Sequence, residues 1–105
     1  MIKIQYDKTK LSAEEITKLA EATRLIVIKA TEIADVFVYA NCAEINIAIA
    51  PVEIFVEMSA HKIQDEDALI KDIKEQITRW KSDTNFSQPI NLTLIPMHWK
   101  VEIEI

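Results

Sequence analysis

Alternation of apolar and polar residues along the chain predicts several β-strands. In the stretch "IKIQY", Ile2, Ile4 and Tyr6 alternate with polar residues, which is the two-residue period of a strand with one buried face. The stretch "VEIFVEMS", residues 52–59, has the same period and follows Pro51. Further strands are expected over 35–40, 44–50, 90–95 (where Pro96 should break the strand) and 99–105.

Two longer segments carry the period of amphipathic helices. Ser12 followed three residues later by Glu15 is a capping box, which predicts the start of the first helix. A second helix is expected over 65–81, because acidic residues lie in its first turn and basic residues lie later. The positions expected to be buried are Ile16, Leu19, Ala20, Thr23, Val27 and Ala30 in the first helix, and Leu69, Ile70, Ile73, Ile77 and Trp80 in the second.

The two halves of the chain have the same order of elements. A shift of fifty positions places Ile2 on Val52, Ile4 on Ile54 and Thr23 on Ile73. We therefore expect one domain, 1–105, built from two pseudo-repeats, 1–50 and 51–105, each a βαβ unit. The predicted fold class is α+β, with a four-stranded mixed sheet and both helices on one face.

Composition narrows the classes of function. The net charge of −5 argues against nucleic acid as a partner, because phosphates favour clustered Lys and Arg. The chain has no glycine, which excludes a P-loop and a dinucleotide-binding fingerprint. Tight turns should therefore use Asn or Asp, which tolerate positive φ.

Location and cofactors are also constrained by the sequence. Cys42 is the single cysteine, so a reducing cytoplasm is expected. We expect no membrane segment, because no apolar run is long enough to span a bilayer. We expect no signal peptide, because the N-terminus has no charged segment followed by an uninterrupted apolar core. We expect no cofactor and no metal site, because His61 and His98 lie far apart in the sequence and no Cys or His cluster supports them.

The outer face of the expected sheet needs a cover. It mixes polar residues with Phe55, so it is too polar for a dry core and too apolar at Phe55 for open water. The segment "VEIEI" at the end adds an unpaired strand edge, and such edges are a liability unless a partner covers them. We therefore expect a homo-oligomer with edges paired between subunits. The residues of this face are Lys3, Gln5, Glu53, Phe55, Glu57, Asn91 and Thr93.

The repeat, the length and the segment "PVEIFVEMSAHKI" together resemble the tautomerase superfamily, which includes macrophage migration inhibitory factor. The segment carries Pro51, a strand and then Ser-Ala-His-Lys-Ile at 59–63. The resemblance implies a homotrimer, and proton transfer on small 2-oxo or enol acids by the amine of an N-terminal proline. Here Met1 takes the place that Pro51 has in the second half, and the bulky Ile2 should keep Met1 in place.

The resemblance also implies which residues form the site. The Met1 α-amine, with an ordinary pKa of about 7.7–8.0, is the candidate proton carrier. Met1 is expected beside Ser59 and Lys62, through related, parallel strands. Lys62 could polarise a substrate carbonyl or bind a substrate carboxylate, and a surface lysine before a helix is at least as good an interpretation.

The remaining candidates have both a functional and an ordinary interpretation. Backbone N–H groups at Ser59 and Ala60 could bind a substrate oxygen. Lys29 could supply a second cation, or simply complement the helix dipole. Asn91 or Thr93 could reach the pocket of a neighbouring subunit, or simply line the polar sheet face.

Two functions therefore follow from the sequence. The first is a tautomerase or isomerase with the Met1 amine as proton carrier, although the missing proline argues against the usual activity. The second is a non-catalytic oligomeric protein that binds a small carboxylate or enol ligand, or another protein, on the same scaffold.

Overall fold

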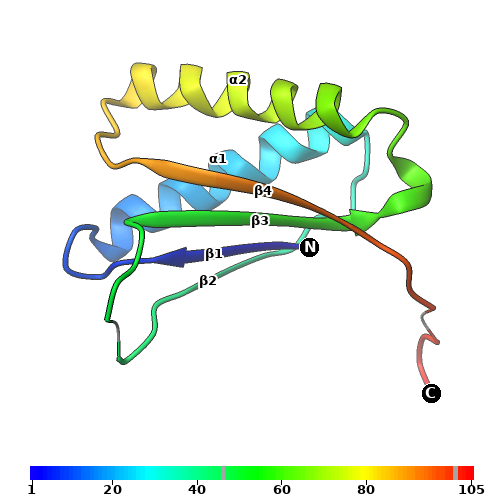
Figure 1. Cartoon of the computed structure of the whole chain (residues 1–105), viewed down its shortest axis with the longest axis horizontal. Coiled ribbons are helices and arrows are strands. Elements are labelled where there is room, and N and C mark those ends of the chain that lie inside the picture. Colours follow the sequence, from blue (N-terminus) through cyan, green and yellow to red (C-terminus); the bar gives the residue numbers. More distant parts are fainter. Residues whose placement is uncertain (46, 101) are drawn as a thin grey trace.

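The computed structural model describes residues 1–45, 47–100 and 102–105. Its sheet has four strands in the order β2-β1-β3-β4, and both helices cover one face of it (Figure 1). The predicted α+β fold with a mixed sheet is confirmed. The elements are β1 (Ile2–Tyr6), α1 (Ala13–Thr31), β2 (Val38–Asn41), β3 (Val52–Ser59), a short 3-10 helix η1 (Ala60–Lys62), α2 (Glu66–Thr84) and β4 (Ile90–Met97).

The two central strands, β1 and β3, run antiparallel. Ile2 pairs with Val56, and Ile4 pairs with Ile54 in the middle of the pair. Each central strand has a parallel outer neighbour, β2 beside β1 and β4 beside β3. The units β1-α1-β2 and β3-α2-β4 are therefore related by an approximate two-fold axis through the centre of the sheet.

The spacing between the two units is not constant along the chain. The central strands follow the predicted shift of fifty, but the helix N-caps Ser12 and Asp65 are 53 positions apart. The helix C-caps Glu32 and Asn85 are also 53 positions apart. The additional three residues correspond to the greater length of β3, which has eight residues where β1 has five.

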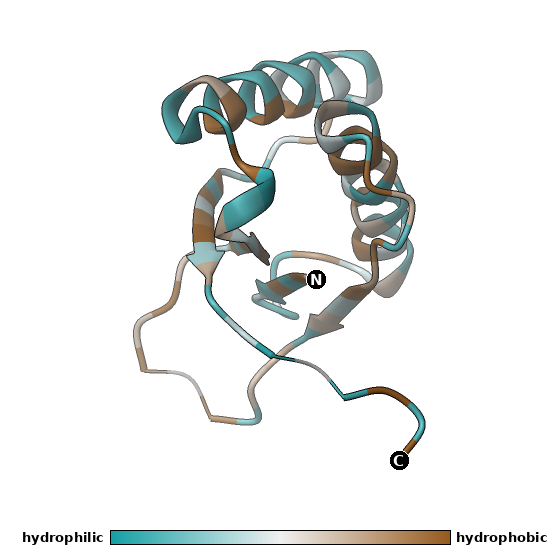
Figure 2. Ribbon diagram, turned by 90° about the vertical axis from the view of Figure 1, so that its right-hand side faces the viewer, coloured by the Kyte–Doolittle hydropathy of each residue, from teal (hydrophilic) through white to brown (hydrophobic). Residues whose placement is uncertain are grey.

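The core lies between the helices and the inner face of the sheet. Ile2, Ile4, Val52, Ile54 and Val56 are fully buried, and the apolar sides of both helices turn towards them (Figure 2). The predicted helical stripes are largely buried. Ile16, Leu19, Thr23 and Val27 of α1 and Ile73 and Ile77 of α2 are buried, while Ala20, Ala30, Leu69, Ile70 and Trp80 are partly buried.

The helices begin where local side chains satisfy their first N–H groups. The Ser12 hydroxyl accepts from the Glu15 N–H at 3.1 Å, and the Glu15 carboxylate accepts from the Ser12 N–H at 3.0 Å, which forms the predicted capping box. The Asp65 carboxylate accepts from the Ala68 N–H at the start of α2. This helix ends at Thr84, beyond the predicted end at 81.

Both helices end in the left-handed conformation without glycine. Asn85 has φ 57°, as expected for a residue type that tolerates this region. Glu32 has φ 58°, and Glu104 also has positive φ, so the expectation of Asn or Asp at such positions is wrong there. No helix among the described residues is both long and apolar enough to cross a bilayer.

Four strand predictions differ from the structure, and the last of them concerns Pro96. β2 begins at Val38 rather than at 35. The described parts of 44–50 and 99–105 are not strands, and Asn46 and Val101 lie outside the described residues. These segments alternate, but a strand needs a neighbour for its backbone groups, and within one chain neither segment pairs in its described part. Both extend from the sheet on the side opposite the helices (Figure 2).

Pro96 does not break β4. The strand continues through Pro96, which pairs with Met58, and ends at Met97. β4 is the outer strand of the sheet, so a missing N–H is tolerated on its unpaired side. The prediction that the strand ends before Pro96 is therefore wrong.

The face of the sheet away from the helices remains largely open. Lys3, Gln5, Asn91 and Thr93 are exposed on it. The central residues of this face are partly buried, and Lys3 Nζ lies 2.9 Å from Glu57 Oε1.

Candidate functional site

Met1 lies at the start of β1, beside the end of β3 (Figure 1). Its α-amine donates to the Glu57 carbonyl oxygen at 2.8 Å. The Glu57 N–H donates to the Met1 carbonyl oxygen, also at 2.8 Å. These two hydrogen bonds continue the ladder of β1 and β3, so the amine has a fixed position.

The antiparallel pairing explains why Met1 lies near Ser59 and Lys62. The sequence-based expectation placed them together through parallel strands, and that reasoning is wrong. The start of β1 meets the end of β3 because the two strands run in opposite directions. Ser59, two residues after Glu57, ends β3. Lys62, five residues after Glu57, ends η1.

A cavity of about 340 Å³ opens beside the Met1 amine. Lys62 and Ser59 line it from the end of β3 and η1, and Trp99 lines it from the segment after β4. Asp35 adds a carboxylate from the loop between α1 and β2. The other lining residues are Ile2, Val27, Thr31, Ile33, Val36, Val56, Glu57 and Met58.

Burial lowers the pKa of the Met1 α-amine below its ordinary value of 8.0. The nearby Glu57 carboxylate opposes this effect and raises the pKa, and the Lys3 ammonium lowers it further. More of the amine is therefore neutral near pH 7 than in a free terminus. The neutral amine is the form that can accept a proton.

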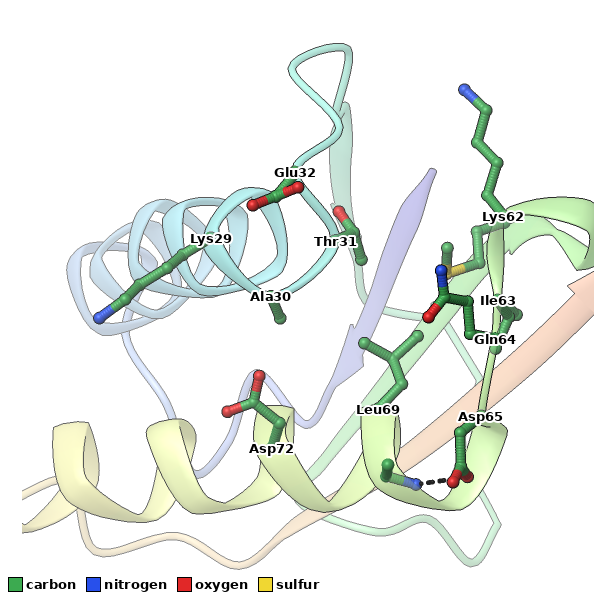
Figure 3. A pocket seen from close by; sticks show the side chains of 12 residues that line it. Lys29, Ala30, Thr31, Glu32, Lys62, Ile63, Gln64, Asp65, Leu69 and Asp72 are labelled. Atoms are coloured by element: carbon green, nitrogen blue, oxygen red, sulfur yellow. Dashed lines mark hydrogen bonds between the residues drawn. The ribbon is translucent and has the colours of Figure 1, made fainter.

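A second hollow of about 430 Å³ lies between the end of α1 and the start of α2 (Figure 3). Lys62 lines this hollow as well as the Met1 cavity. Lys29 lines only the second hollow, and its side chain extends away from Lys62 (Figure 3). The structure therefore does not bring Lys29 to the Met1 amine.

Three other candidates lie outside the Met1 cavity within one chain. Asn91 and Thr93 lie on the exposed face of β4, where they pair with Glu53 and Phe55. Ala60 begins η1 and accepts the Ile63 N–H at 3.3 Å, but it does not line the cavity. A role for Asn91 or Thr93 in a neighbouring subunit stays a prediction.

Comparison with known proteins finds similar proteins by structure alone. No protein-family model matches the chain, and no curated protein matches its sequence. A malonate semialdehyde decarboxylase, solved as wild type, with its first-position proline changed to alanine and after inactivation, superposes with a TM-score of 0.71. Its identity is 12%, and the match covers 97% of this chain and 90% of that one.

Two further solved structures match over most of their length. The FG41 malonate semialdehyde decarboxylase, inhibited by 3-bromopropiolate, has a TM-score of 0.68 at 15% identity and covers 98% of this chain and 89% of its own. A fused 4-OT, described as an asymmetric trimer, has a TM-score of 0.63 at 14% identity, with 91% and 85% covered. The chain has the tautomerase-superfamily fold. At these identities the likeness shows the fold and no particular activity.

The tautomerase fold here includes site residues that sequence reasoning did not single out. Glu57 lies against the Met1 amine, and the antiparallel register of β1 and β3 would have indicated this. Asp35 and Trp99 line the cavity from segments that were expected to be strands and that form none at these two residues. No signal in the sequence marked these two residues as parts of the site.

The two histidines lie together although they are distant in the sequence. The rings of His61 and His98 have centroids 5.5 Å apart and are nearly perpendicular, at 81°. Among the described residues, no group of three His, Cys, Asp or Glu side chains is arranged to hold a metal ion. The histidine pair is a ring contact between η1 and the segment after β4.

Proposed function

We propose that the protein catalyses proton transfer on small 2-oxo or enol acids, with the Met1 amine as base and Lys62 as the partner of the substrate carboxylate. The observation that carries this proposal is the position of the amine. It is held by the Glu57 carbonyl oxygen beside a cavity that Lys62 also lines. The tautomerase fold of the chain supports the same class of chemistry.

The reaction needs one group that accepts a proton and then returns it. The neutral Met1 amine takes the hydroxyl proton of the enol, which leaves an enolate. The resulting ammonium then donates a proton to the neighbouring carbon, which gives the ketone. Ser59, which lines the cavity, is the candidate to stabilise the oxygen that carries negative charge between these steps, and Ala60 has no part in it.

Turnover should be slow because Met1 supplies a primary amine in place of the secondary amine of proline. We expect the native protein to turn over enol acids well below about 10 per second, the typical rate of an enzyme. A Met1→Pro variant, made with a removable initiator methionine, should be faster. Proline belongs at position 1 and not at position 2, because Ile2 is fully buried and its N–H donates to the Phe37 carbonyl oxygen at 2.7 Å.

The test compares the native protein, Met1→Pro and Lys62→Ala in an enol-to-ketone assay, with intact mass used to establish the first residue of each sample. Lys62→Ala should raise KM, and Lys29→Ala should leave it unchanged. Treatment with 3-bromopropiolate, which inhibits the FG41 decarboxylase, should add mass at Met1. Equal rates for all variants, with no modification at Met1, would contradict the proposal.

The second candidate function is ligand binding without catalysis, which the absence of the proline favours. In that case a small 2-oxo acid should stabilise the protein without being converted. A ligand at a hundredfold excess over its Kd adds about 2.7 kcal/mol to the free energy of unfolding. A thermal shift with no turnover, lost in Lys62→Ala, would favour this function over catalysis.

Assembly as a homotrimer in the cytoplasm is part of the same proposal. The fused 4-OT neighbour is a trimer, and the segments that lack a strand partner here carry exposed apolar side chains, namely Ile45, Ile47, Ile49, Ile103 and Ile105. A neighbouring subunit would then bring Asn91 or Thr93 to the rim of the cavity. Sedimentation should give a trimer, and deletion of residues 101–105 should weaken it. A stable monomer at micromolar concentration would contradict this assembly.

A further inference from the structure

The two histidines of the chain meet in the folded protein, and neither of them lines the Met1 cavity. His61 belongs to η1, and His98 is the first residue after β4. Their ring centroids are 5.5 Å apart. The expectation of no metal site rested partly on their distance in the sequence, and the structure removes that part of its basis.

The separation of the two rings suits two ligands of one metal ion. Zinc binds an imidazole nitrogen at about 2.0–2.1 Å, so two imidazoles on one tetrahedral ion have ring centroids about 5–5.5 Å apart. The observed separation lies at the upper end of that range. Coordination fixes the direction of one nitrogen in each ring and leaves the angle between the ring planes free, so the observed angle of 81° is compatible with it.

Both histidines are exposed, so an ion can reach them from solvent and the rings have room to turn. Imidazole nitrogen is a preferred ligand of Zn²⁺, Cu²⁺ and Ni²⁺, whereas Mg²⁺ and Ca²⁺ prefer oxygen. We propose that His61 and His98 together bind a divalent ion of the first kind, such as Zn²⁺. Among the described residues no third His, Cys, Asp or Glu completes the group, so water fills the other positions on the ion.

The ion fixes the segment after β4 to η1. From His98 to Lys100 the chain forms no strand, and it extends from the sheet on the side opposite the helices (Figure 2). The short helix η1 directly follows β3, so a metal link between the two histidines ties this segment to a central strand. Because the ion binds the folded arrangement, it also stabilises the protein by mass action. None of these steps uses the Met1 amine, so the site is independent of the proposed function.

The test uses the untagged full chain, because a histidine tag would bind the same ions. Calorimetry with ZnCl2 should give one ion per chain and a Kd of about 1–200 μM, roughly what two of the four ligands of a structural zinc site supply. MgCl2 is the control for attraction to the net charge of −5, and it should not bind in this way. The ring C–H signals of both histidines should change together in an NMR titration with ZnCl2.

The variants His61→Phe and His98→Phe retain a ring at each position and remove the nitrogens. Each should weaken zinc binding by at least about tenfold. In the native protein zinc should raise the Tm and reduce the fast backbone motion of residues 98–100, and in either variant it should do neither. Cys42→Ser removes the single thiol of the chain and should bind zinc as the native protein does.

Zinc binding of native strength in His61→Phe or His98→Phe would overturn the proposal. Equal binding of Mg²⁺, or a change in the ring signals of only one histidine, would also overturn it. Zinc binding that left the motion of residues 98–100 unchanged would contradict the link between this segment and η1. Failure of the proposed function would be seen separately, as an absence of turnover in Met1→Pro while zinc binding persisted.

Discussion

The two ends of the β1-β3 pair have equivalent backbones and different surroundings. At one end the Glu57 N–H donates to the Met1 carbonyl oxygen at 2.8 Å. At the other end the Asp7 N–H donates to the Pro51 carbonyl oxygen at 3.0 Å. The shift of fifty positions relates these two bonds. Only the Met1 end has an amine that also donates back to its partner strand, because proline has no N–H.

What lies beyond each end decides where a cavity forms. At the Met1 end, β3 continues past its last partner as far as Ser59, and η1 follows. At the Pro51 end, β1 stops at Tyr6 and does not extend past β3. The three additional residues of β3 thus build a wall beside the amine that the other end lacks.

The side chains near the C-terminal ends of the two helices also leave the Met1 end more open than the Pro51 end. Under the 53-residue relation of the helices, Val27 and Ile33 correspond to Trp80 and Phe86. The smaller pair lines the Met1 cavity, whereas the two aromatic residues pack against each other at 5.4 Å. Two units that share one core therefore differ at their ends through a few side chains, which leave a cavity at one end and pack together at the other.

The largest expected effect tests the equivalence of the two units at their centre. Ile4 and Ile54 are cross-strand partners and both are fully buried. Ile4→Ala and Ile54→Ala should each lower the free energy of unfolding by about 2–5 kcal/mol, because each leaves a cavity in the core. Urea unfolding measures both values. A cost below about 1 kcal/mol at one of the two positions would show that the units do not share one core.

The next prediction places an aromatic ring in the Met1 cavity, at the position that corresponds to Phe86. Ile33→Phe should weaken binding of a small 2-oxo acid by at least about tenfold, because the larger ring occupies cavity space. The matched variant Phe86→Ile, at the corresponding position, should leave binding unchanged. Calorimetry measures both. Unchanged binding in Ile33→Phe would show that the ligand lies elsewhere.

A third prediction concerns the charge beside the amine. Activity should rise with pH through a midpoint below 8.0, because the pKa of the Met1 amine is lowered and the neutral amine is the base. Glu57 raises this pKa, so Glu57→Gln should move the midpoint to lower pH. Asp7→Asn, the corresponding change at the Pro51 end, should not move it. A midpoint at higher pH in Glu57→Gln would contradict the assignment that the Glu57 carboxylate raises the pKa of the Met1 amine.

The smallest effect compares the two helix C-caps. Glu32 and Asn85 both have positive φ, which costs more for Glu than for Asn. Glu32→Gly should raise the free energy of unfolding by about 0.5–1 kcal/mol, and Asn85→Gly should raise it less. Thermal unfolding of the two variants measures the difference. Equal gains would mean that the side chain of Glu32 carries no additional strain.

Much of the fold could be predicted because the period of the apolar residues indicates which side of each strand and helix is buried. Alternation at 2–6 and 52–59 marked the central strands, and Ser12 with Glu15 marked the start of α1. The direction of pairing could not be predicted, because alternating strands such as these present the same faces when reversed. Residues 44–50 alternate as well, and their pattern alone does not say which chain supplies a neighbouring strand.

That three of the candidate residues lie close together could be predicted only from the resemblance. Met1, Ser59 and Lys62 lie on one cavity, although antiparallel pairing and not parallel pairing brings them together. Asp35 and Trp99 begin two segments whose alternation predicted strands, but both residues lie outside the strands and helices of the structure. Their place in the site depends on tertiary packing.

The most direct test of the account maps a small 2-oxo acid onto the two ends of the β1-β3 pair. Backbone amide NMR signals of the native protein are followed during titration with phenylpyruvate. The account predicts shifts at Glu57, Ser59 and Lys62, and none at Asp7 or Thr9. Shifts confined to the Pro51 end, or no shifts at saturating ligand, would contradict the claim that the Met1 end is the functional one.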